Sequence, residues 1–232
     1  MLMIFGHRIM GVVKEARCVF DEAMAINGRF AAYIVTCEER RQVLAETLAR
    51  LRATDWACEP DLQLDDGSAP TKLARIHATW LRALERVAAG PADFALILED
   101  DLDFNLHLRH NLAAWGPLRG GDGNAPFFGS VYNADNRPVL WRPPKQSFFI
   151  ANAQQVWGAQ AVIVSRLTAA YFLAHWSEES GAADLRMPRL AARLAPVYIH
   201  APSLIQHVGD ASTWGGPFHQ ARDFDRAWRA PA

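Results

Sequence analysis

The chain has few cysteines, a balanced charge and no long apolar run. Its three cysteines, Cys18, Cys37 and Cys58, show no CxxC spacing, and so sparse and odd a set favours a reducing compartment over a disulfide scaffold. No segment approaches the roughly eighteen consecutive apolar residues of a membrane-spanning helix, and glycine, histidine and arginine interrupt the apolar opening "MLMIFGHRIMGVV". We therefore expect a cytoplasmic protein without a transmembrane segment, which leaves peripheral membrane contact open.

The charge balance also restricts the partners. The 24 Lys and Arg residues and the 25 Asp and Glu residues give a formal net charge of −1, and the absence of a basic block argues against nucleic acid as a partner. Half of the 232 residues are hydrophobic, enough for a sizeable core. No low-complexity linker divides the chain. We predict an N-terminal extension over residues 1–29 and a single domain over residues 30–232, with a small polar substrate.

The first hundred residues alternate between strand and helix patterns. Apolar, β-branched runs predict strands at 30–37 ("FAAYIVTC"), within "CEPDLQLDDGSAP" and at 94–98 ("FALIL"). Leucines at helical spacing predict a helix over 38–52, and a second helical pattern runs from Thr71 to Ala89, where Gly90 and Pro91 end it. This β-α-β-α-β order is typical of an α/β fold with a mainly parallel central sheet and helices on both faces.

The second half is less regular. We expect a short strand in "APFFGSVYNADN", a strand in "VWGAQAVIVS" and a helix in "RLTAAYFLAHW" with Ser165 as its N-cap. The Pro- and aromatic-rich stretch "PVLWRPPKQSFF" gives no clear pattern.

An acidic cluster follows the strand at 94–98. In "FALILEDDLDF" five apolar residues lead directly into Glu99, Asp100 and Asp101, and Asp103 follows. Because neighbouring carboxylates repel and resist desolvation, the cluster is either a solvated loop or a cation site. Acidic residues also follow the first two predicted strands, and ligands of such sheets gather at the carboxyl ends of the strands. Mg²⁺ and Mn²⁺ are commonly held by one or two carboxylates together with a substrate's phosphates, so the pattern favours a cation and a nucleoside diphosphate.

Three segments in this order resemble the nucleotide-sugar glycosyltransferases of GT-A fold: "TKLARIHATWLRAL", "ILEDDLDF" and "VWGAQAVIVSRLTAAYFL". The lipooligosaccharide glycosyltransferases of family 25 have a similar His-containing helix, an LEDD strand and a G-x-x-A-x-x-x-S-R join. The N-acetylglucosaminyltransferases of family 13 have a similar K-I/L-A-R helix, an EDD-L strand and an S-x-W/Y-N-x-D/N acceptor loop, matched here by Ser130, Tyr132, Asn133 and Asp135. The resemblance runs from about Tyr33 to Gly209.

The resemblance implies a Mn²⁺ or Mg²⁺ ion at the acidic cluster and a nucleotide-sugar beside it. Asp101 becomes the metal-binding acid of a DxD-type motif and Asp100 the acid on the ribose side, although a literal D-L-D reading would use Asp103 instead. The residues expected around the nucleotide are Thr36, Glu38, Arg40, Asp65, Arg75 and His77. For His77, which lies beside the apolar stripe of its helix, a packed structural histidine is an equally good reading.

We divide the domain into a nucleotide-binding half (30–104) and an acceptor-side half with a C-terminal lid (105–232). The resemblance implies further roles in the second half. Asp184 is the implied general base for the acceptor hydroxyl, with Glu178 and Glu179 as competitors and a helix N-terminal acid as the structural alternative. His207 is a second metal ligand or a structural histidine. We expect Tyr132, Asn133 and Trp157 to contact the acceptor and "GDASTWGGPFH" to form a lid over the donor. Trp141, Trp157 and Trp214 would either stack on sugar rings or pack in the core.

The combined prediction is a metal-dependent glycosyltransferase. A UDP-sugar donor, a glycan or glycolipid-precursor acceptor and inversion at the anomeric carbon are favoured. One alternative is a sugar nucleotidyltransferase, which would ordinarily carry a Gly-rich basic loop after the first strand, whereas "TCEERRQ" contains no glycine. The other is a degenerate GT-A domain that binds carbohydrate, or serves in assembly, without turnover.

Overall fold

The predicted strand and helix alternation organises the N-terminal part of the chain. In the computed structural model, which describes residues 30–134, 146–209 and 219–231, three strands are parallel neighbours in the order β2-β1-β3. They are β1 (Phe30–Cys37), β2 (Asp61–Asp65) and β3 (Phe94–Leu98). The expected extension over residues 1–29 lies outside the described residues. The division into halves and the single domain stay predictions.

Helices join these strands where the apolar spacing predicts them. A 3₁₀ turn, η1 (Glu38–Arg40), leads into α1 (Arg41–Arg52), and α2 (Lys72–Ala89) connects β2 to β3. Thr71 caps α2, since its Oγ1 accepts a hydrogen bond from the backbone N–H of Ala74 at 3.2 Å. Local sequence therefore determines this part of the fold.

The second half makes the sheet mixed rather than mainly parallel. β7 (Ala161–Ser165) runs antiparallel to β3, with Ala161 opposite Leu98. The full order is β2-β1-β3-β7-β5-β8-β6, with β5 (Phe128–Ser130), β6 (Phe148–Ala151) and β8 (Val197–His200). Of these later strands, β5 and β8 pair in parallel and the other pairs are antiparallel. The α/β class is confirmed. Because β7 begins where β3 ends, residues 157–160 lie at the same sheet edge as the acidic cluster.

A small second sheet follows β3. β4 (Leu102–Phe104) pairs antiparallel with β9 (Ile205–His207), and Leu102 lies opposite His207. β4 was not predicted, because three residues are too few for a periodic pattern. The pairing is extended by a hydrogen bond from the Val208 N–H to the Asp101 carbonyl, 2.9 Å long, so the late histidine is brought beside the acidic cluster.

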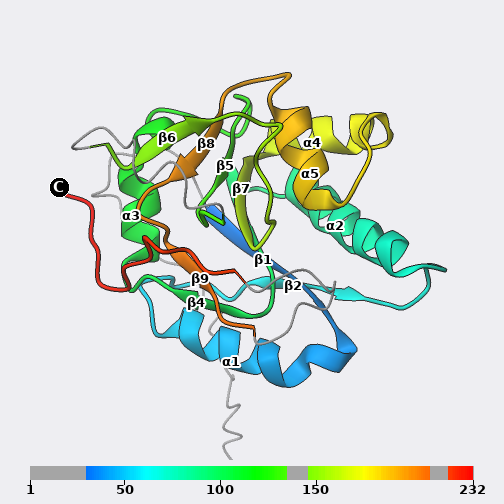
Figure 1. Ribbon diagram of the computed structural model, residues 1–232, viewed down its shortest axis with the longest axis horizontal. Coiled ribbons are helices and arrows are strands. Elements are labelled where there is room, and N and C mark those ends of the chain that lie inside the picture. The colour runs from blue at the N-terminus through cyan, green and yellow to red at the C-terminus, as the bar shows by residue number, and fades with distance from the viewer. Residues whose placement is uncertain (1–29, 135–145, 210–218, 232) are drawn as a thin grey trace, which may run out of the picture.

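Helices cover both faces of the large sheet (Figure 1). On one face lie α2, α4 (Arg166–His175) and α5 (Ala183–Ala191), packed against the side chains of Ala95 and Ile97. On the other lie α1, α3 (Leu108–Ala114) and the small sheet, packed against Leu96 and Leu98. This double covering explains why β3 is a continuous apolar run. Short 3₁₀ turns occur at η2 (Gly116–Leu118) and η4 (Trp176–Glu178).

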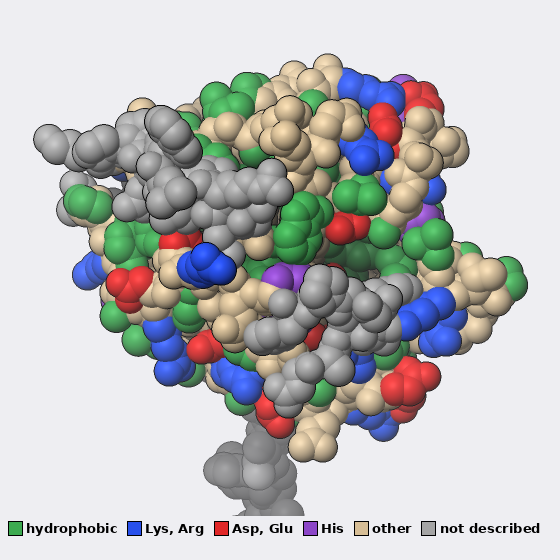
Figure 2. All heavy atoms as spheres, viewed as in Figure 1, with side chains coloured by type: hydrophobic (Ala, Val, Ile, Leu, Met, Phe, Trp, Pro, Cys, Tyr) green, Lys and Arg blue, Asp and Glu red, His purple; other side chains and the backbone are tan. Residues whose placement is uncertain are grey.

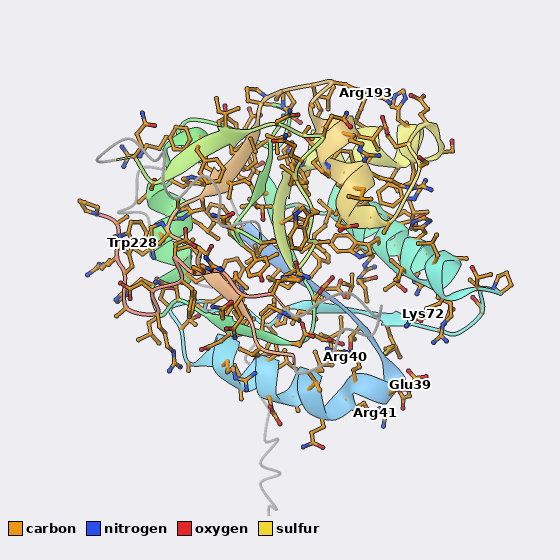
Figure 3. The ribbon with its side chains drawn as sticks, viewed as in Figure 1. Glu39, Arg40, Arg41, Lys72, Arg193 and Trp228 are labelled. Atoms are coloured by element: carbon orange, nitrogen blue, oxygen red, sulfur yellow. The ribbon has the colours of Figure 1, made fainter. Side chains whose placement is uncertain are left out.

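The C-terminal segment 219–231 is hydrogen-bonded to two buried asparagines, Asn105 just before α3 and Asn111 within it. Asn105 Nδ2 donates to the carbonyl oxygens of Asp225 (2.7 Å) and Trp228 (2.8 Å), and Asn111 Oδ1 accepts from the Ala230 N–H at 2.8 Å. Trp228 is labelled at this side of the molecule in Figure 3. Within the described ranges, no helix has the length and apolar character needed to cross a membrane.

Candidate functional site

A cavity of about 670 Å³ opens at the carboxyl ends of β1, β2 and β3, within the usual size range of small-molecule sites. Figure 2 shows a hollow near the centre of the corresponding face, where acidic and histidine side chains gather. Many of the residues singled out from the sequence line the cavity: Thr36, Arg40, Asp65, Arg75, Asp100, Asp101, Trp157, Asp184 and His207. The expected convergence of strand ends is therefore confirmed.

Asp100 is held firmly at the end of β3. Its carboxylate accepts hydrogen bonds from Thr36 Oγ1 (2.5 Å) and Arg40 Nε (2.6 Å), and its carbonyl oxygen accepts one from Thr47 Oγ1 (2.7 Å). Burial raises the pKa of Asp100 above its ordinary value, while the hydrogen bonds from Thr36 and Arg40 oppose the rise. Both carboxylate oxygens have protein partners, which suits a fixed acceptor for a ligand hydroxyl.

Asp101 faces a histidine that lies far away in the sequence. Its Oδ2 is 2.6 Å from an Arg40 terminal nitrogen and 3.3 Å from His207 Nε2. Burial opposes ionisation, but the bonds and charges of His207 and Arg40 outweigh it and hold the pKa of Asp101 below its ordinary value. Burial likewise acts to lower the pKa of His207, and Asp101 overcomes this and raises it. Each of the two side chains therefore favours the charged form of the other.

The second ring nitrogen of His207 supports the charged form. Nδ1 lies 3.2 Å from the carbonyl oxygen of His219, so both ring nitrogens face acceptors, and only an imidazolium can donate to both. The His207 and His219 rings stack with centroids 5.2 Å apart. Metal binding by His207 would consequently require loss of the Nε2 proton.

Arg40 joins the two aspartates from the opposite side. Figure 3 shows Arg40 beside Arg41 at the start of α1, and the exposed fractions of their side chains, 21% and 76%, show that only the first turns inward. The sequence predicted a base or phosphate contact for Arg40. In the structure its guanidinium pairs with Asp100 and Asp101, and a contact with a nucleotide stays a prediction.

The residues present fit a divalent cation at Asp101. Asp101 is 5% exposed, and its buried Oδ1 has no hydrogen-bond partner among the residues the structure describes. Gly209 leaves room at Oδ2, because an added Cβ would overlap this oxygen and lie 3.1 Å from His207 Nε2. In the described part of the chain, no three His, Cys, Asp or Glu side chains are arranged to hold a metal. The protein would therefore offer Asp101 and His207 as ligands, and a bound molecule or water would have to supply the others.

Asp103 points away from this arrangement. It does not line the cavity, its Oδ1 accepts from the Phe104 N–H at 2.9 Å, and the same atom lies 3.9 Å from Arg226 Nε. This position favours the register in which Asp101 is the ligand.

Asp184 lies in the first turn of α5 and also lines the cavity. Its Oδ2 accepts a hydrogen bond from the Gly158 N–H at 3.2 Å, which fixes the carboxylate beside the loop that precedes β7. The competing acids Glu178 and Glu179 are instead paired with Arg193 and do not line the cavity. Of these three acids, Asp184 is the one placed to act on a bound molecule.

Two basic side chains of α2 also line the cavity. Lys72 and Arg75 extend from the first turn of α2, and Arg75 Nε lies 2.7 Å from Asp65 Oδ2 at the end of β2. Lys72 and Arg75 bring positive charge to the cavity, and the acids Asp65 and Glu39 line it beside them.

Four predicted residues do not line the cavity. Glu38 is exposed and pairs with Arg41. His77 Nε2 lies 3.1 Å from the Gly181 carbonyl oxygen, and the His77 ring packs edge-on against Trp176. Burial and the charge of Arg186 lower the pKa of His77. These contacts agree with the packed reading of His77.

The remaining two, Tyr132 and Asn133, are 1% exposed. Tyr132 Oη lies 2.7 Å from His219 Nδ1 and so touches the site through that histidine. The Asn133 N–H donates to Ser203 Oγ at 3.0 Å. By contrast Trp157 lines the cavity, with its ring edge-on to His219. Asp135, Trp141, Trp214 and most of the expected lid lie outside the described residues.

Sequence reasoning missed Lys72 and Gln160 and placed His219 only at the end of the expected lid, although all three line the cavity. Lys72 could have been predicted from the sequence, because it lies at the start of a predicted helix next to a predicted site. The other two depend on long-range pairing. Glu99, expected only as a supporting acid, also lines the cavity, and burial together with the charge of Asp101 raises the pKa of Glu99 to about 8.

The fold and site thus define an α/β protein with a mixed acidic and basic cavity at its strand ends. The chain matches no family model and no curated protein sequence. Among solved structures it has a distant likeness to the galactosyltransferase LgtC. The complex of LgtC with donor and acceptor sugar analogues shows 11% identity and a TM-score of 0.42, and an active-site mutant of LgtC shows 10% and 0.43. Each match covers 73% of this chain and 72% of the other. Similarity at this level carries no argument about chemistry.

Proposed function

We propose that this protein is a metal-dependent glycosyltransferase of GT-A type. It moves a sugar from a nucleoside-diphosphate donor, with UDP favoured, to a glycan or glycolipid-precursor acceptor, with inversion. The observation that carries the proposal is that one cavity contains both a buried carboxylate with a spare oxygen, Asp101, and a separate carboxylate, Asp184, fixed on another element.

The charge pattern supports an orientation for the donor. A diphosphate between Lys72, Arg75 and a cation at Asp101 would have its charge compensated, while Asp65 can accept the imide proton of uracil. Asp100, with its carboxylate held by Thr36 and Arg40, is the acceptor for a ribose hydroxyl. A divalent cation held by Asp101 and His207 would supply charge neutralisation for the departing diphosphate.

Asp184 supplies the base. As the acceptor oxygen attacks the anomeric carbon, the bond from that carbon to the diphosphate breaks, and Asp184 takes the proton of the attacking hydroxyl. The hydrogen bond from Gly158 holds the carboxylate in place for this transfer. A single displacement of this kind inverts the anomeric configuration.

The test is calorimetric titration with UDP in the presence and absence of Mn²⁺. Wild type should bind UDP more tightly with Mn²⁺, and Asp101→Asn should lose that metal-dependent gain, because it removes an anionic ligand. Asp103→Asn is the matched control: it removes an acid from the same cluster but outside the cavity, and should behave as wild type. If wild type binds no nucleoside diphosphate, the proposal is wrong.

Turnover separates the catalytic roles and the alternatives. Asp184→Asn should bind UDP as wild type does but release no UDP from UDP-sugars in the presence of simple glycoside acceptors; undiminished release would exclude Asp184 as the base. Formation of pyrophosphate from UTP and a sugar 1-phosphate would instead favour a nucleotidyltransferase. Donor binding without turnover by wild type would favour a carbohydrate-binding module.

A further inference from the structure

Two polar side chains that line the cavity, Glu99 and Gln160, have no role in the proposed binding of nucleotide and metal or in the proposed base catalysis. They are cross-strand neighbours at the end of the β3 and β7 ladder, since Leu98 pairs with Ala161 and the Glu99 N–H donates to the Gln160 carbonyl at 2.9 Å. Directly opposed residues on one face of an antiparallel pair have their Cβ atoms about 5 Å apart. Both residues line the cavity.

Gln160 has an unused polar atom. The residue is 8% exposed, and its buried Oε1 has no hydrogen-bond partner among the described residues. The loop before β7 makes room for this amide, because a Cβ added at Gly158 would lie 2.7 Å from Oε1. Gly158 has a φ of +89°, a conformation that favours glycine. Buried polar groups normally have a hydrogen-bond partner. The unused Oε1 of Gln160, at the cavity wall, therefore points to a ligand that donates a hydrogen bond to it.

The surroundings indicate what kind of ligand. Glu99, Asp101 and Asp184 line the cavity with Gln160, whereas Lys72 and Arg75, on α2, line it together with Asp65 and Glu39. A hydroxyl both donates and accepts, so it can satisfy a carboxyl group and an amide at the same time. Trp157, next to Gly158, adds an aromatic surface of the kind that packs on sugar rings.

We propose that Gln160 is a specificity-determining residue that, together with Glu99, binds hydroxyl groups of the transferred sugar. This inference rests on the proposed function, because it places the sugar of the donor in the same cavity. A sugar carboxylate, as in a uronic acid, is disfavoured because it cannot donate a hydrogen bond to Gln160 Oε1 and would add a negative charge near Asp184.

The experiment compares the affinities for UDP, UDP-glucose, UDP-galactose and UDP-glucuronate by calorimetry with Mn²⁺. Wild type should bind at least one of the two neutral UDP-hexoses more tightly than UDP, and UDP-glucuronate more weakly than either. Gln160→Met keeps the side-chain length but removes the amide. It should bind UDP normally and the preferred UDP-hexose about tenfold more weakly, the order expected for a lost hydrogen bond with a buried partner left unpaired.

A matched control and a stability measurement exclude a merely structural effect. Gln42→Met makes the same chemical change on the exposed surface of α1 and should leave all four affinities unchanged. Gln160→Met should melt at or above the wild-type temperature, since it replaces a buried amide, whose Oε1 has no partner among the described residues, by an apolar group. A large fall would indicate a structural role.

Several outcomes would overturn the inference. It is wrong if wild type binds UDP but gains no affinity from either hexose, if UDP-glucuronate binds as tightly as the hexoses, or if Gln160→Met binds the hexose donor as wild type does. The first two comparisons use wild type alone and remain decisive if the variant does not fold. In all three cases UDP binding persists, so the proposed function stands. Failure of wild type to bind any nucleoside diphosphate overturns both.

Discussion

Replacing Arg40 by methionine should destabilise the protein, because two buried aspartates would lose the guanidinium that joins them. Arg40 lies 2.6 Å from an oxygen of each carboxylate, and the side chains of Asp100 and Asp101 are 6% and 7% exposed. Removing one partner of a buried ion pair typically costs about 3–5 kcal/mol. Since Arg40 itself is 21% exposed, and Thr36 and His207 remain as partners, we expect the lower end, about 3 kcal/mol.

For a chain of this length, that free energy corresponds to a fall in melting temperature of about 6–12 °C. Thermal and urea unfolding at pH 7, followed by circular dichroism, measure it. Arg41→Met is the matched control, because Arg41 is 76% exposed and pairs with Glu38 at the surface; surface pairs contribute about 0–1 kcal/mol. The double variant Arg40→Met with Asp101→Asn should recover part of the loss, since it removes one of the unpaired charges.

Acid and metal give two further checks on the same variant. The pKa of Asp101 is lowered in the folded protein, so its paired carboxylate stabilises wild type above the ordinary pKa of about 3.9, and this contribution is lost as the pH falls through the folded value. The difference between wild type and Arg40→Met should therefore shrink below about pH 4. Mn²⁺ should stabilise the variant more than wild type if Asp101 binds the metal. A melting temperature equal to that of wild type at pH 7 would refute the account of Arg40 as the required counter-charge.

Two further predictions concern Glu99 and Gly209. Burial raises the pKa of Glu99 from 4.5 to about 8, so the folded state retains a proton that the unfolded chain releases. The free energy of unfolding should therefore fall by a few kcal/mol between about pH 4.5 and pH 8. Urea unfolding at pH 5 and pH 9 should show that Glu99→Gln removes this fall, and an unchanged pH dependence would contradict the prediction. Gly209→Ala places a methyl group against Asp101 Oδ2 and should weaken Mn²⁺-dependent UDP binding by about tenfold or more, whereas Gly116→Ala, where the new Cβ meets nothing nearer than 3.4 Å, should bind normally.

Local patterns in the sequence predicted much of the fold around the site. Apolar runs and helical spacing marked β1, β3 and α2, and the predicted N-cap at Ser165 is present. The placement of Asp65, Asp100 and Asp101 at one sheet edge followed from the parallel order of the first three strands. The prediction of a mainly parallel sheet failed in the second half, because an isolated apolar strand pattern does not indicate its direction.

The sequence by itself therefore determined that acids would meet at the carboxyl ends of parallel strands, since strand and helix periodicities act over a few residues and fix which side chains end each strand. Only the tertiary structure decided which distant groups join them. The pairing of β4 with β9 brings His207 to Asp101 across 106 residues, and the antiparallel entry of β7 places Gln160 opposite Glu99. Such contacts depend on strand register and direction, which are set by packing of the whole core and leave no periodic signal in the chain.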